Sequence, residues 1–414
     1  MTRTRGTRRP PTIAGTLCVA AVAFAWLHAE AWAQTAADDW PCWRGPDHDG
    51  IATESGWNAN ALSAGPAIKW KKEVGAGFSS VAVKGANVYT MGNRGGQDTV
   101  VCLDAATGDE RWHHTYPCKE GDYAGPRATP TVDGDCVYTM SRAGQVFCLD
   151  AGSGQVRWKR ELAGEMNVGI PTWGLAGSAL VYKNAVFLNA GEKGVALDKT
   201  SGKTLWSNAP GKGGYATPVL FAFRGKPALA LFGEKHVFGV DAATGKELWE
   251  HPWETQYDVN AADPVVSGTK VFISSGYGRG CAMLDVAGPK PRTVWEHKNM
   301  KNHFSSCVLF KGHLYGIDGN AGKGALRCLD PATGKETWSQ ELGFGSLIVV
   351  DGKLVVLNEN GMLFIASADP ASYKELSKGQ VLEKKVCWTP PAFCHGKIYC
   401  RNSPGELVCV DVSK

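Results

Sequence analysis

Residues 103–112 read Leu-Asp-Ala-Ala-Thr-Gly-Asp-Glu-Arg-Trp, and this ten-residue phrase returns along the chain with small changes. Close copies occupy residues 149–158, 197–206, 240–249 and 329–338, and a looser copy runs from Leu284 to Trp295. Repetition at a period of about 20–50 residues is typical of one supersecondary unit copied many times. The repeat therefore restricts the fold class before any single residue is interpreted.

Each phrase carries the chemistry of a β-hairpin. Asp104 can accept hydrogen bonds from the amides of the turn, and Gly108 supplies the positive φ that a tight reversal requires. Upstream in each copy lie two more short runs of β-branched and aromatic residues, such as residues 129–132 and 136–140 around an Asp-Gly turn. Four strands per repeat predict a propeller blade, whereas a solenoid would need parallel coils rather than short hairpins.

Two sets of recurring residues count the blades. The turn aspartates are Asp104, Asp150, Asp198, Asp241, Asp285, Asp330, Asp369 and Asp411. The tryptophans are Trp70, Trp112, Trp158, Trp206, Trp249, Trp295, Trp338 and Trp388. Both sets have eight members, and we interpret seven of the eight tryptophans as packing between blades. Residues 67–74 lack a preceding phrase and residues 406–410 lack a following one, so the two segments together complete a unit. The sequence predicts an all-β, eight-bladed propeller of four-stranded antiparallel blades, closed by pairing of its N-terminal and C-terminal strands.

The N-terminus has the features of an export leader. Four arginines precede an apolar stretch from Ile13 to Leu27, and Ala31-Trp-Ala33 is a small-residue cleavage signature. We expect a signal peptide over residues 1–33, an N-terminal extension over 34–66 and the propeller over 67–414. An uncleaved anchor is the alternative, although the stretch is short for a membrane span. Cys18 follows Leu17 rather than a small residue, so no lipid attachment is predicted. The mature chain should be monomeric, lack a transmembrane segment, and reside in the periplasm, the cell envelope or outside the cell.

Charge and cysteines restrict the function further. The chain carries a net charge of +4, but residues 1–33 hold four Arg and one Glu, so about +1 remains without a basic run. We therefore predict no nucleic-acid partner. The repeat position two residues before the turn aspartate holds a cysteine in four copies, which should be a small buried strand residue; these are Cys102, Cys148, Cys328 and Cys409. Cys42 and Cys118 lie in proline-flanked loops of an exported chain, so a disulfide between them is one candidate pairing that the sequence leaves open.

One cysteine-rich segment invites a zinc interpretation. Cys387, Cys394, His395 and Cys400 are close in sequence, but their spacing matches no established ligand pattern and strand alternation would separate them. The sequence pattern therefore predicts no metal site.

Polar and aromatic residues precede the innermost strand of each predicted blade, where all the blades converge on the axis. The predicted cofactor-binding or ligand-binding residues are Arg127, Trp173, Tyr215, Asn260, Asn302 and His303, and Asp263 is the candidate catalytic carboxylate. A guanidinium can bind an anion in bidentate fashion, and two rings can enclose a planar group. The alternative is that these side chains bond to one another and to water and fill the channel.

The repeated phrase resembles the pyrroloquinoline quinone (PQQ) propeller repeat over residues 67–414. That repeat occurs in quinoprotein alcohol dehydrogenases and in the propeller of the outer-membrane barrel-assembly lipoprotein. Asp39-Trp-Pro-Cys-Trp-Arg-Gly-Pro46 is similar to the start of exported PQQ-like propellers of unassigned role. The resemblance implies a propeller, with PQQ and calcium as a cofactor pair if the chain is an oxidoreductase.

The chain departs from the dehydrogenases. They are typically longer, and they commonly carry two adjacent cysteines beside the cofactor, whereas no Cys-Cys pair occurs in this sequence. We therefore predict an exported, non-catalytic propeller that binds a protein partner or a small ligand on one face, without a certain cofactor. The alternative is a PQQ-dependent oxidoreductase of the alcohol dehydrogenase type, with the quinone on the axis and Asp263 as the base. A hydrolase or lyase using the same residues is a third possibility.

Overall fold

The structure is a computed structural model that describes residues 1–2, 39–383 and 386–414. Contacts divide the chain into two units, residues 1–34 and 35–414, and the fold described below is that of the second unit. The predicted leader, apart from its first two residues, and the start of the predicted extension lie outside the described residues.

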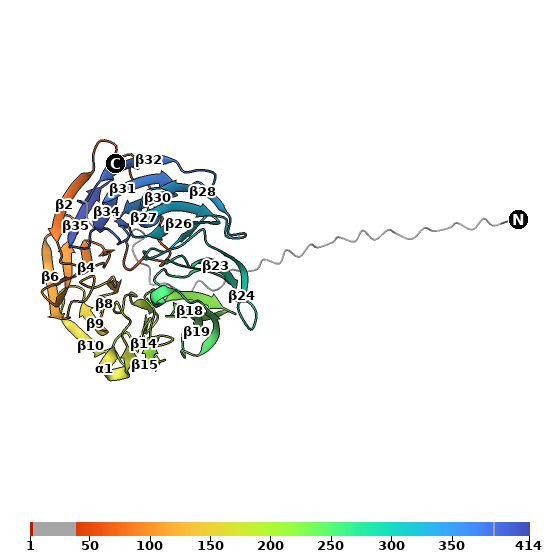
Figure 1. Ribbon diagram of the computed structural model, residues 1–414, viewed down its shortest axis with the longest axis horizontal. Helices are drawn as coiled ribbons and strands as arrows, with labels where there is room; N and C mark the ends of the chain where they lie inside the picture. The colour runs from red at the N-terminus through yellow and green to blue at the C-terminus, as the bar shows by residue number, and fades with distance from the viewer. Residues whose placement is uncertain (3–38, 384–385) are drawn as a thin grey trace. The chain divides into compact units, whose positions relative to one another are not determined.

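The described part of the chain contains eight four-stranded antiparallel blades that follow one another around a ring (Figure 1). The first two blades comprise β3 (Ala82–Lys84), β4 (Asn87–Arg94), β5 (Gln97–Asp104) and β6 (Glu110–Pro117), then β7 (Thr131–Asp133), β8 (Cys136–Met140), β9 (Gln145–Asp150) and β10 (Val156–Glu161). The third and fourth comprise β12 (Leu180–Tyr182), β13 (Ala185–Leu188), β14 (Val195–Asp198) and β15 (Thr204–Ser207), then β17 (Val219–Phe223), β18 (Lys226–Phe232), β19 (His236–Asp241) and β20 (Glu247–Pro252).

The remaining blades continue the same order. The fifth and sixth comprise β21 (Val265–Ser267), β22 (Lys270–Ser275), β23 (Gly280–Asp285) and β24 (Arg292–His297), then β25 (Val308–Phe310), β26 (His313–Asn320), β27 (Lys323–Leu329) and β28 (Glu336–Glu341). The seventh comprises β29 (Gly345–Val350), β30 (Lys353–Asn358), β31 (Met362–Ser367) and β32 (Glu375–Gln380). The eighth comprises β33 (Ala392–Cys394), β34 (Lys397–Arg401), β35 (Glu406–Asp411) and β2 (Ala67–Glu73).

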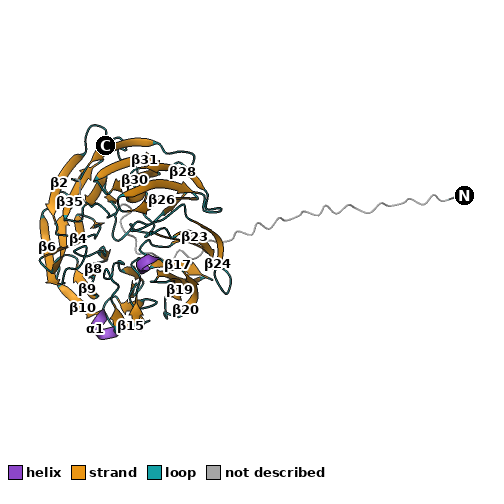
Figure 2. Cartoon of the chain, in the orientation of Figure 1, coloured by secondary structure: helices purple, strands orange, loops and turns teal. Residues whose placement is uncertain are grey.

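Strands dominate the described residues (Figure 2). Within residues 39–383 and 386–414, helical structure is limited to α1 (Leu162–Met166) and a 3₁₀ turn at Gln256–Asp258. Two short parallel pairs join β11 (Val168–Gly169) to β16 (Gly211–Lys212), and β1 (Ile51–Ala52) to β29. No helix in the described ranges is long and apolar enough to cross a membrane.

The predicted ring closure is confirmed. Strand β2 pairs antiparallel with β35, and Trp70 lies opposite Cys409 in the register. The eighth blade is therefore built from both ends of the propeller sequence, and β2 forms its outermost strand.

The aspartate of each phrase organises its turn as expected. The Asp104 carboxylate accepts the N–H groups of Ala106 and Thr107 at 2.8 and 3.0 Å, and Gly108 has φ +72°. The same two bonds recur at Asp150, where Gly152 and Ser153 donate. These bonds reproduce the turn chemistry read from the sequence.

The repeat glycine has a second role, because the tryptophan of the preceding blade covers it. A Cβ atom on Gly154 would lie 2.4 Å from Cε3 of Trp112, so a larger residue cannot occupy this position without displacement. The Trp112 indole N–H also donates to the carbonyl of Ala151 at 3.0 Å. The same glycine contact joins Trp70 to Gly108, Trp158 to Gly202, Trp206 to Gly245 and Trp295 to Gly334. The phrase therefore encodes the blade-to-blade contact as well as the turn.

The prediction that Trp388 belongs to the tryptophan series is wrong. The outer strand of the seventh blade is β32, in which Ser377 lies opposite Ile365, just as Trp112 lies opposite Cys102 in the first blade. The Ser377 hydroxyl donates to the carbonyl of Ala59 at 2.6 Å. Trp388 instead precedes β33 and lines the cavity described below. The series misled because the degenerate copy after Asp369 carries no tryptophan of its own.

The candidate Cys42–Cys118 pairing is also wrong, because both residues are buried free thiols. Cys42 directs its thiol toward the carbonyl of Gly45 at 2.9 Å. Burial and the nearby carboxylates of Asp47 and Asp49 raise its thiol pKa well above the ordinary value, which keeps it in the unreactive protonated form.

The tryptophan–glycine contact is testable at Gly154. Gly154→Ala should lower the free energy of unfolding by about 2–4 kcal/mol, since it adds a clash with Trp112 to the strain of a left-handed residue. Urea unfolding monitored by tryptophan fluorescence measures this change.

Gly134→Ala is the matched control. Gly134 has φ +60°, but a Cβ there meets no atom within 4 Å. This variant should lose only the left-handed strain, about 1–2 kcal/mol. Equal losses in the two variants would show that the tryptophan contact contributes nothing.

Candidate functional site

The alternation of strand direction gives the ring two different faces. The turns between first and second strands, and between third and fourth strands, lie together on one face, which we name the turn face. The turns between second and third strands and the connections between blades lie on the other, which we name the loop face.

A cavity of about 230 Å³ lies at the centre of the ring. The segments before the innermost strands of seven blades contribute to it, which places it where the blades converge. Its lining is mainly aromatic and consists of Trp43, Phe78, Tyr123, Arg127, Trp173, Ala176, Ser178, Tyr215, Thr217, Val259, Ala261, Asp263, Tyr277, His303, Phe304, Ala321, Trp388 and Pro390.

The cavity brings together five of the seven residues named from the sequence. They are Arg127, Trp173, Tyr215, Asp263 and His303. The sequence signal that selected them, polar and aromatic residues just before each innermost strand, therefore picked out side chains that share one cavity.

Asn260 and Asn302 do not line the cavity. The Asn260 amide donates to the carbonyls of Gly233 and Glu234, and its oxygen accepts the hydroxyls of Thr255 and Ser275. The Asn302 amide donates to the carbonyl of Ile317 at 3.0 Å. Both side chains are fully buried, so they fix the connections between blades instead of meeting a ligand.

Arg127 is already engaged at the cavity wall. Its guanidinium donates to the backbone carbonyls of Gly125, Asp122 and Tyr123 at 2.7, 3.2 and 3.0 Å, and it lies 5.7 Å from the Phe78 ring centre. Burial, with the neighbouring Arg142, lowers the pKa of Arg127 to about 10. The side chain stays charged at neutral pH, but the geometry does not leave its donors free for a bidentate clamp.

The N-terminal segment reaches into the cavity at Asp263. The Trp43 indole N–H donates to Asp263 Oδ2 at 2.6 Å, and the amide of Thr217 donates to Oδ1 at 2.8 Å. Arg44 forms an ion pair with the same carboxylate, with Nη1 3.6 Å from Oδ2. Burial raises the pKa of Asp263, and the nearby Arg44 guanidinium opposes that shift.

Residues 40–52, which we name the plug, cross the turn face. Trp40 bonds to Val83 in the first blade, and the Pro41 carbonyl accepts the amide of Val132 in the second. Arg44 donates to the carbonyl of Cys307 just before β25, and Ile51 pairs with Val349 of the seventh blade. The plug thus bridges separated blades and covers one end of the central channel.

His303 is buried against other rings. Both of its ring nitrogens lack a hydrogen-bond partner within the described part of the protein, and its side chain is only 6% exposed. Phe304 stacks on it with ring centres 3.6 Å apart, and Tyr277 meets it edge-on at 4.7 Å. Burial lowers the pKa of His303 to about 4, so the ring is neutral at physiological pH.

Aromatic contacts continue around the cavity beyond His303. Ring centres lie 4.8–6.4 Å apart along the path from Tyr215 through Trp173, Tyr257 and Tyr277, and again from Phe304 through Trp388 to Phe78 and Tyr123. We name these nine residues, with His303 at the middle of the path, the aromatic collar. Sequence reasoning did not select Trp43, Tyr123, Tyr257 or Tyr277, because single aromatic residues in loops carry no periodic signal.

The residues present do not fit the calcium and quinone pair that the resemblance implies. Calcium takes six to eight oxygen ligands, but among the described residues Asp263 is the only carboxylate on the cavity wall, and both its oxygens already accept hydrogen bonds. The side-chain oxygen of Asn260, the nearest side-chain amide to Asp263 in the sequence, already accepts two hydroxyl hydrogen bonds. We therefore derive no step through a bound quinone.

The buried imidazole makes stability depend on pH. Its pKa is about 4 when folded and 6.5 as a model value, so the unfolded chain binds more protons between these limits. The contribution of neutral His303 to the free energy of unfolding is fully present above about pH 6.5. It is lost as the pH falls toward 4, which lowers the free energy of unfolding by as much as about 3 kcal/mol. His303→Gln should flatten this part of the profile in urea unfolding at a series of pH values. An unchanged slope in the variant would show that His303 does not titrate in this way.

Comparison with known proteins gives the family. The sequence profile described as "Outer membrane protein assembly factor BamB" matches residues 52–135 and 120–340. BamB of Yersinia pestis is 21% identical over 367 residues, which cover 83% of this chain and 77% of the relative. Tetrathionate hydrolase of Acidithiobacillus ferrooxidans is 25% identical over 248 residues, or 55% of this chain and 47% of that protein. This chain therefore spans about half the length of the hydrolase.

Solved structures agree on the architecture. The quinohemoprotein alcohol dehydrogenase of Comamonas testosteroni matches with a TM-score of 0.68 at 14% identity, covering 91% of this chain and 81% of the enzyme. At this identity the likeness shows the fold alone. It confirms the propeller of the PQQ-type repeat that the recurring phrase predicts. Because the family profile matches more than half of its length, the chain belongs to the family described as outer membrane protein assembly factor BamB.

Proposed function

We propose that this chain is an exported, non-catalytic propeller that binds a protein partner at the loop face through the aromatic collar. The observation that carries the proposal is the collar itself, a path of ring contacts around a cavity that the plug covers from the turn face. Tyrosine and tryptophan supply large contact areas with a polar tip, and they are enriched at protein interfaces.

The collar presents rings to solvent as well as to the cavity. Tyr123 is 57% exposed and Tyr257 is 59% exposed, whereas Tyr215 and His303 are buried. An entering side chain would therefore meet exposed rings first and then an apolar interior. This gradation suits the insertion of an apolar or aromatic side chain from another protein.

Three tyrosines of the collar have an unusual backbone. Tyr123, Tyr257 and Tyr277 all lie in the left-handed region, with φ of +56°, +63° and +52°. Bulky residues rarely adopt this conformation, and such strain clusters at ligand-binding sites. The surrounding loops hold these rings at the cavity despite that strain, which supports a binding role for them.

The chemistry of the cavity favours binding over catalysis. Asp263 is bonded to Trp43 and Thr217 and paired with Arg44, so proton transfer to it would require displacement of the plug. His303 is neutral and enclosed by rings. A general base needs an accessible acceptor within hydrogen-bond reach of its substrate.

The family description supports a protein as the partner and the cell envelope as the location. Members are described by their part in outer membrane protein assembly. Residues 1–33 carry the pattern of an export leader, which supports the same location.

Site-specific crosslinking tests the binding face. A photoreactive phenylalanine derivative at position 257 or 123 should capture a discrete protein in intact cells of the source organism, and mass spectrometry would identify it. Trp173→Ala should reduce capture at position 257, because loss of an aromatic anchor weakens such interfaces by about 2 kcal/mol.

Val156 and Leu205 are the controls, since they are exposed by 42% and 45% but lie on outer strands far from the collar in the repeat. Capture at these positions equal to capture at position 257 would contradict the proposal. Saturable one-to-one binding of PQQ with calcium, abolished by Arg127→Ala, would favour the oxidoreductase instead.

A further inference from the structure

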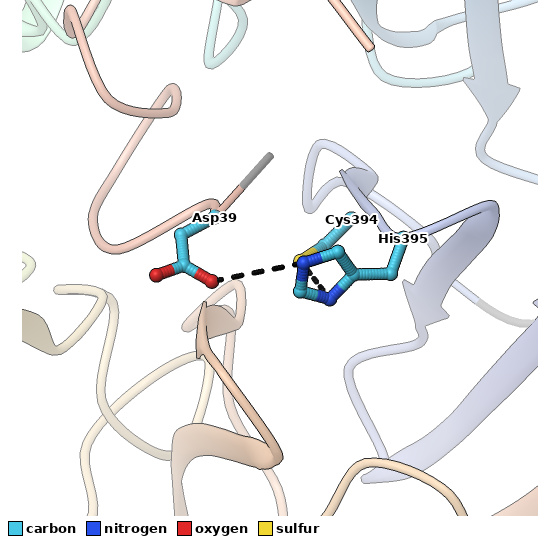
Figure 3. A group of neighbouring side chains, drawn as sticks. All are labelled: Asp39, Cys394 and His395. Atoms are coloured by element: carbon cyan, nitrogen blue, oxygen red, sulfur yellow. Dashed lines mark hydrogen bonds and ion pairs between the residues drawn. The ribbon is translucent and has the colours of Figure 1, made fainter. Parts of the chain in front are cut away.

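A second cluster of chemically reactive side chains lies on the turn face, away from the collar. Asp39, Cys394 and His395 place one potential ligand atom each within 4.8 Å of one another (Figure 3). The Cys394 sulfur lies 3.3 Å from His395 Nδ1, and His395 Nε2 lies 4.0 Å from Asp39 Oδ1. The carboxylate and the sulfur are buried, whereas the imidazole is 48% exposed.

The turn that carries His395 recurs in every blade. Its first residue always has a positive φ, and across the described blades that residue is Gly85, Gly134, Lys183, Arg224, Gly268, Lys311, Asp351 or His395. The backbone conformation at His395 therefore belongs to the repeat. What distinguishes the eighth blade is the side chains, since a cysteine followed by a histidine occupies this turn in none of the other seven.

Hydrogen bonds to backbone amides position both sides of the cluster. The Glu54 carboxylate accepts the amides of His395 and Gly396, each at 2.6 Å, and so fixes the turn. Asp39 Oδ1 accepts the amide of Gly85 at 2.9 Å. A carboxylate has about four lone-pair sites, so Asp39 keeps capacity for a cation.

We propose that Asp39, Cys394 and His395 bind one zinc ion, with water in the fourth position. Thiolate, imidazole and carboxylate together are typical zinc ligands, and a sulfur ligand disfavours magnesium and calcium. Tetrahedral bonds of about 2.0–2.3 Å place neighbouring ligand atoms about 3.3–3.6 Å apart, so the group closes with movements of about 1 Å. The Cys394 thiol proton leaves to solvent on binding, and the half-exposed imidazole gives the ion a route of entry.

The site would join two segments that the chain keeps far apart. Asp39 immediately precedes the plug, whose Trp40 bonds to Val83, and Cys394 and His395 belong to the blade that closes the ring. Zinc therefore links the plug to the closing blade. This role is independent of the collar and of any partner bound there.

Metal binding to the purified mature chain is the test. Competition with a chromophoric zinc chelator should give one zinc per chain, and zinc should raise the melting temperature. Cobalt should give a thiolate charge-transfer band and the visible bands of a tetrahedral site. His395→Asn, which tolerates a left-handed backbone, should weaken zinc binding about tenfold or more and remove the rise in melting temperature. Asp39→Asn should weaken it in the same direction.

His313→Asn is the matched control, because His313 follows the equivalent turn of the sixth blade outside the cluster. It should bind zinc as the wild type does. Cys394→Ser should abolish the charge-transfer band. If this substitution of a buried residue prevents folding, His395→Asn, which changes a half-exposed residue, still tests the site. Absence of stoichiometric zinc, or equal loss in His313→Asn and His395→Asn, would overturn the proposal.

Discussion

The contact between the tryptophan of one blade and the glycine of the next is the constraint on which the ring depends. Each blade is a small sheet with a limited core of its own, so its stability comes from its neighbours. The contact sets the spacing between blades, and the indole N–H bond to the carbonyl after the turn aspartate fixes their relative height. Where the phrase degenerates the contact changes: Trp249 has no bond for its indole nitrogen among the described residues, and Trp338 packs on Tyr373.

The plug lies on the turn face only, so the two faces of the repeating ring differ. It covers the turn face and donates a hydrogen bond to Asp263, the one carboxylate that the described part of the chain places on the cavity wall. A buried carboxylate without donors would be strongly unfavourable, so Trp43, Thr217 and Arg44 stabilise the closed channel. The loop face keeps its exposed rings as a consequence. The plug and the collar thus lie at opposite ends of the central channel, one covering the turn face and the other leaving rings exposed at the loop face.

The fold was predictable from the sequence because its repeat unit occurs several times, so the close copies outweigh one copy that departs from the pattern. The residues of a binding site occur only once, and no repetition supports their assignment. The position just before an innermost strand selected five residues that line the cavity, which are Arg127, Trp173, Tyr215, Asp263 and His303. It also selected Asn260 and Asn302, because their positions in the sequence are equivalent. Their amides instead bond to backbone carbonyls of neighbouring segments. Trp388 shows the opposite error, since its spacing suited the series while Ser377 holds the structural position. Asp39 contacts His395 near the C-terminal end of the chain, and Trp43 bonds to Asp263, 220 residues away; no local pattern reports such contacts.

Closure of the ring by β2 and β35 has a consequence for the time course of folding. The first strand of the ring pairs with its last, so the strand pairing of longest sequence separation among the described strands forms only when almost the whole chain is available. During synthesis or export from the N-terminus, β2 emerges early and keeps an unpaired edge until β35 follows. An unpaired edge is a template for association with other strands. The interval between the two strands is therefore the period in which this chain depends most on protection by other molecules.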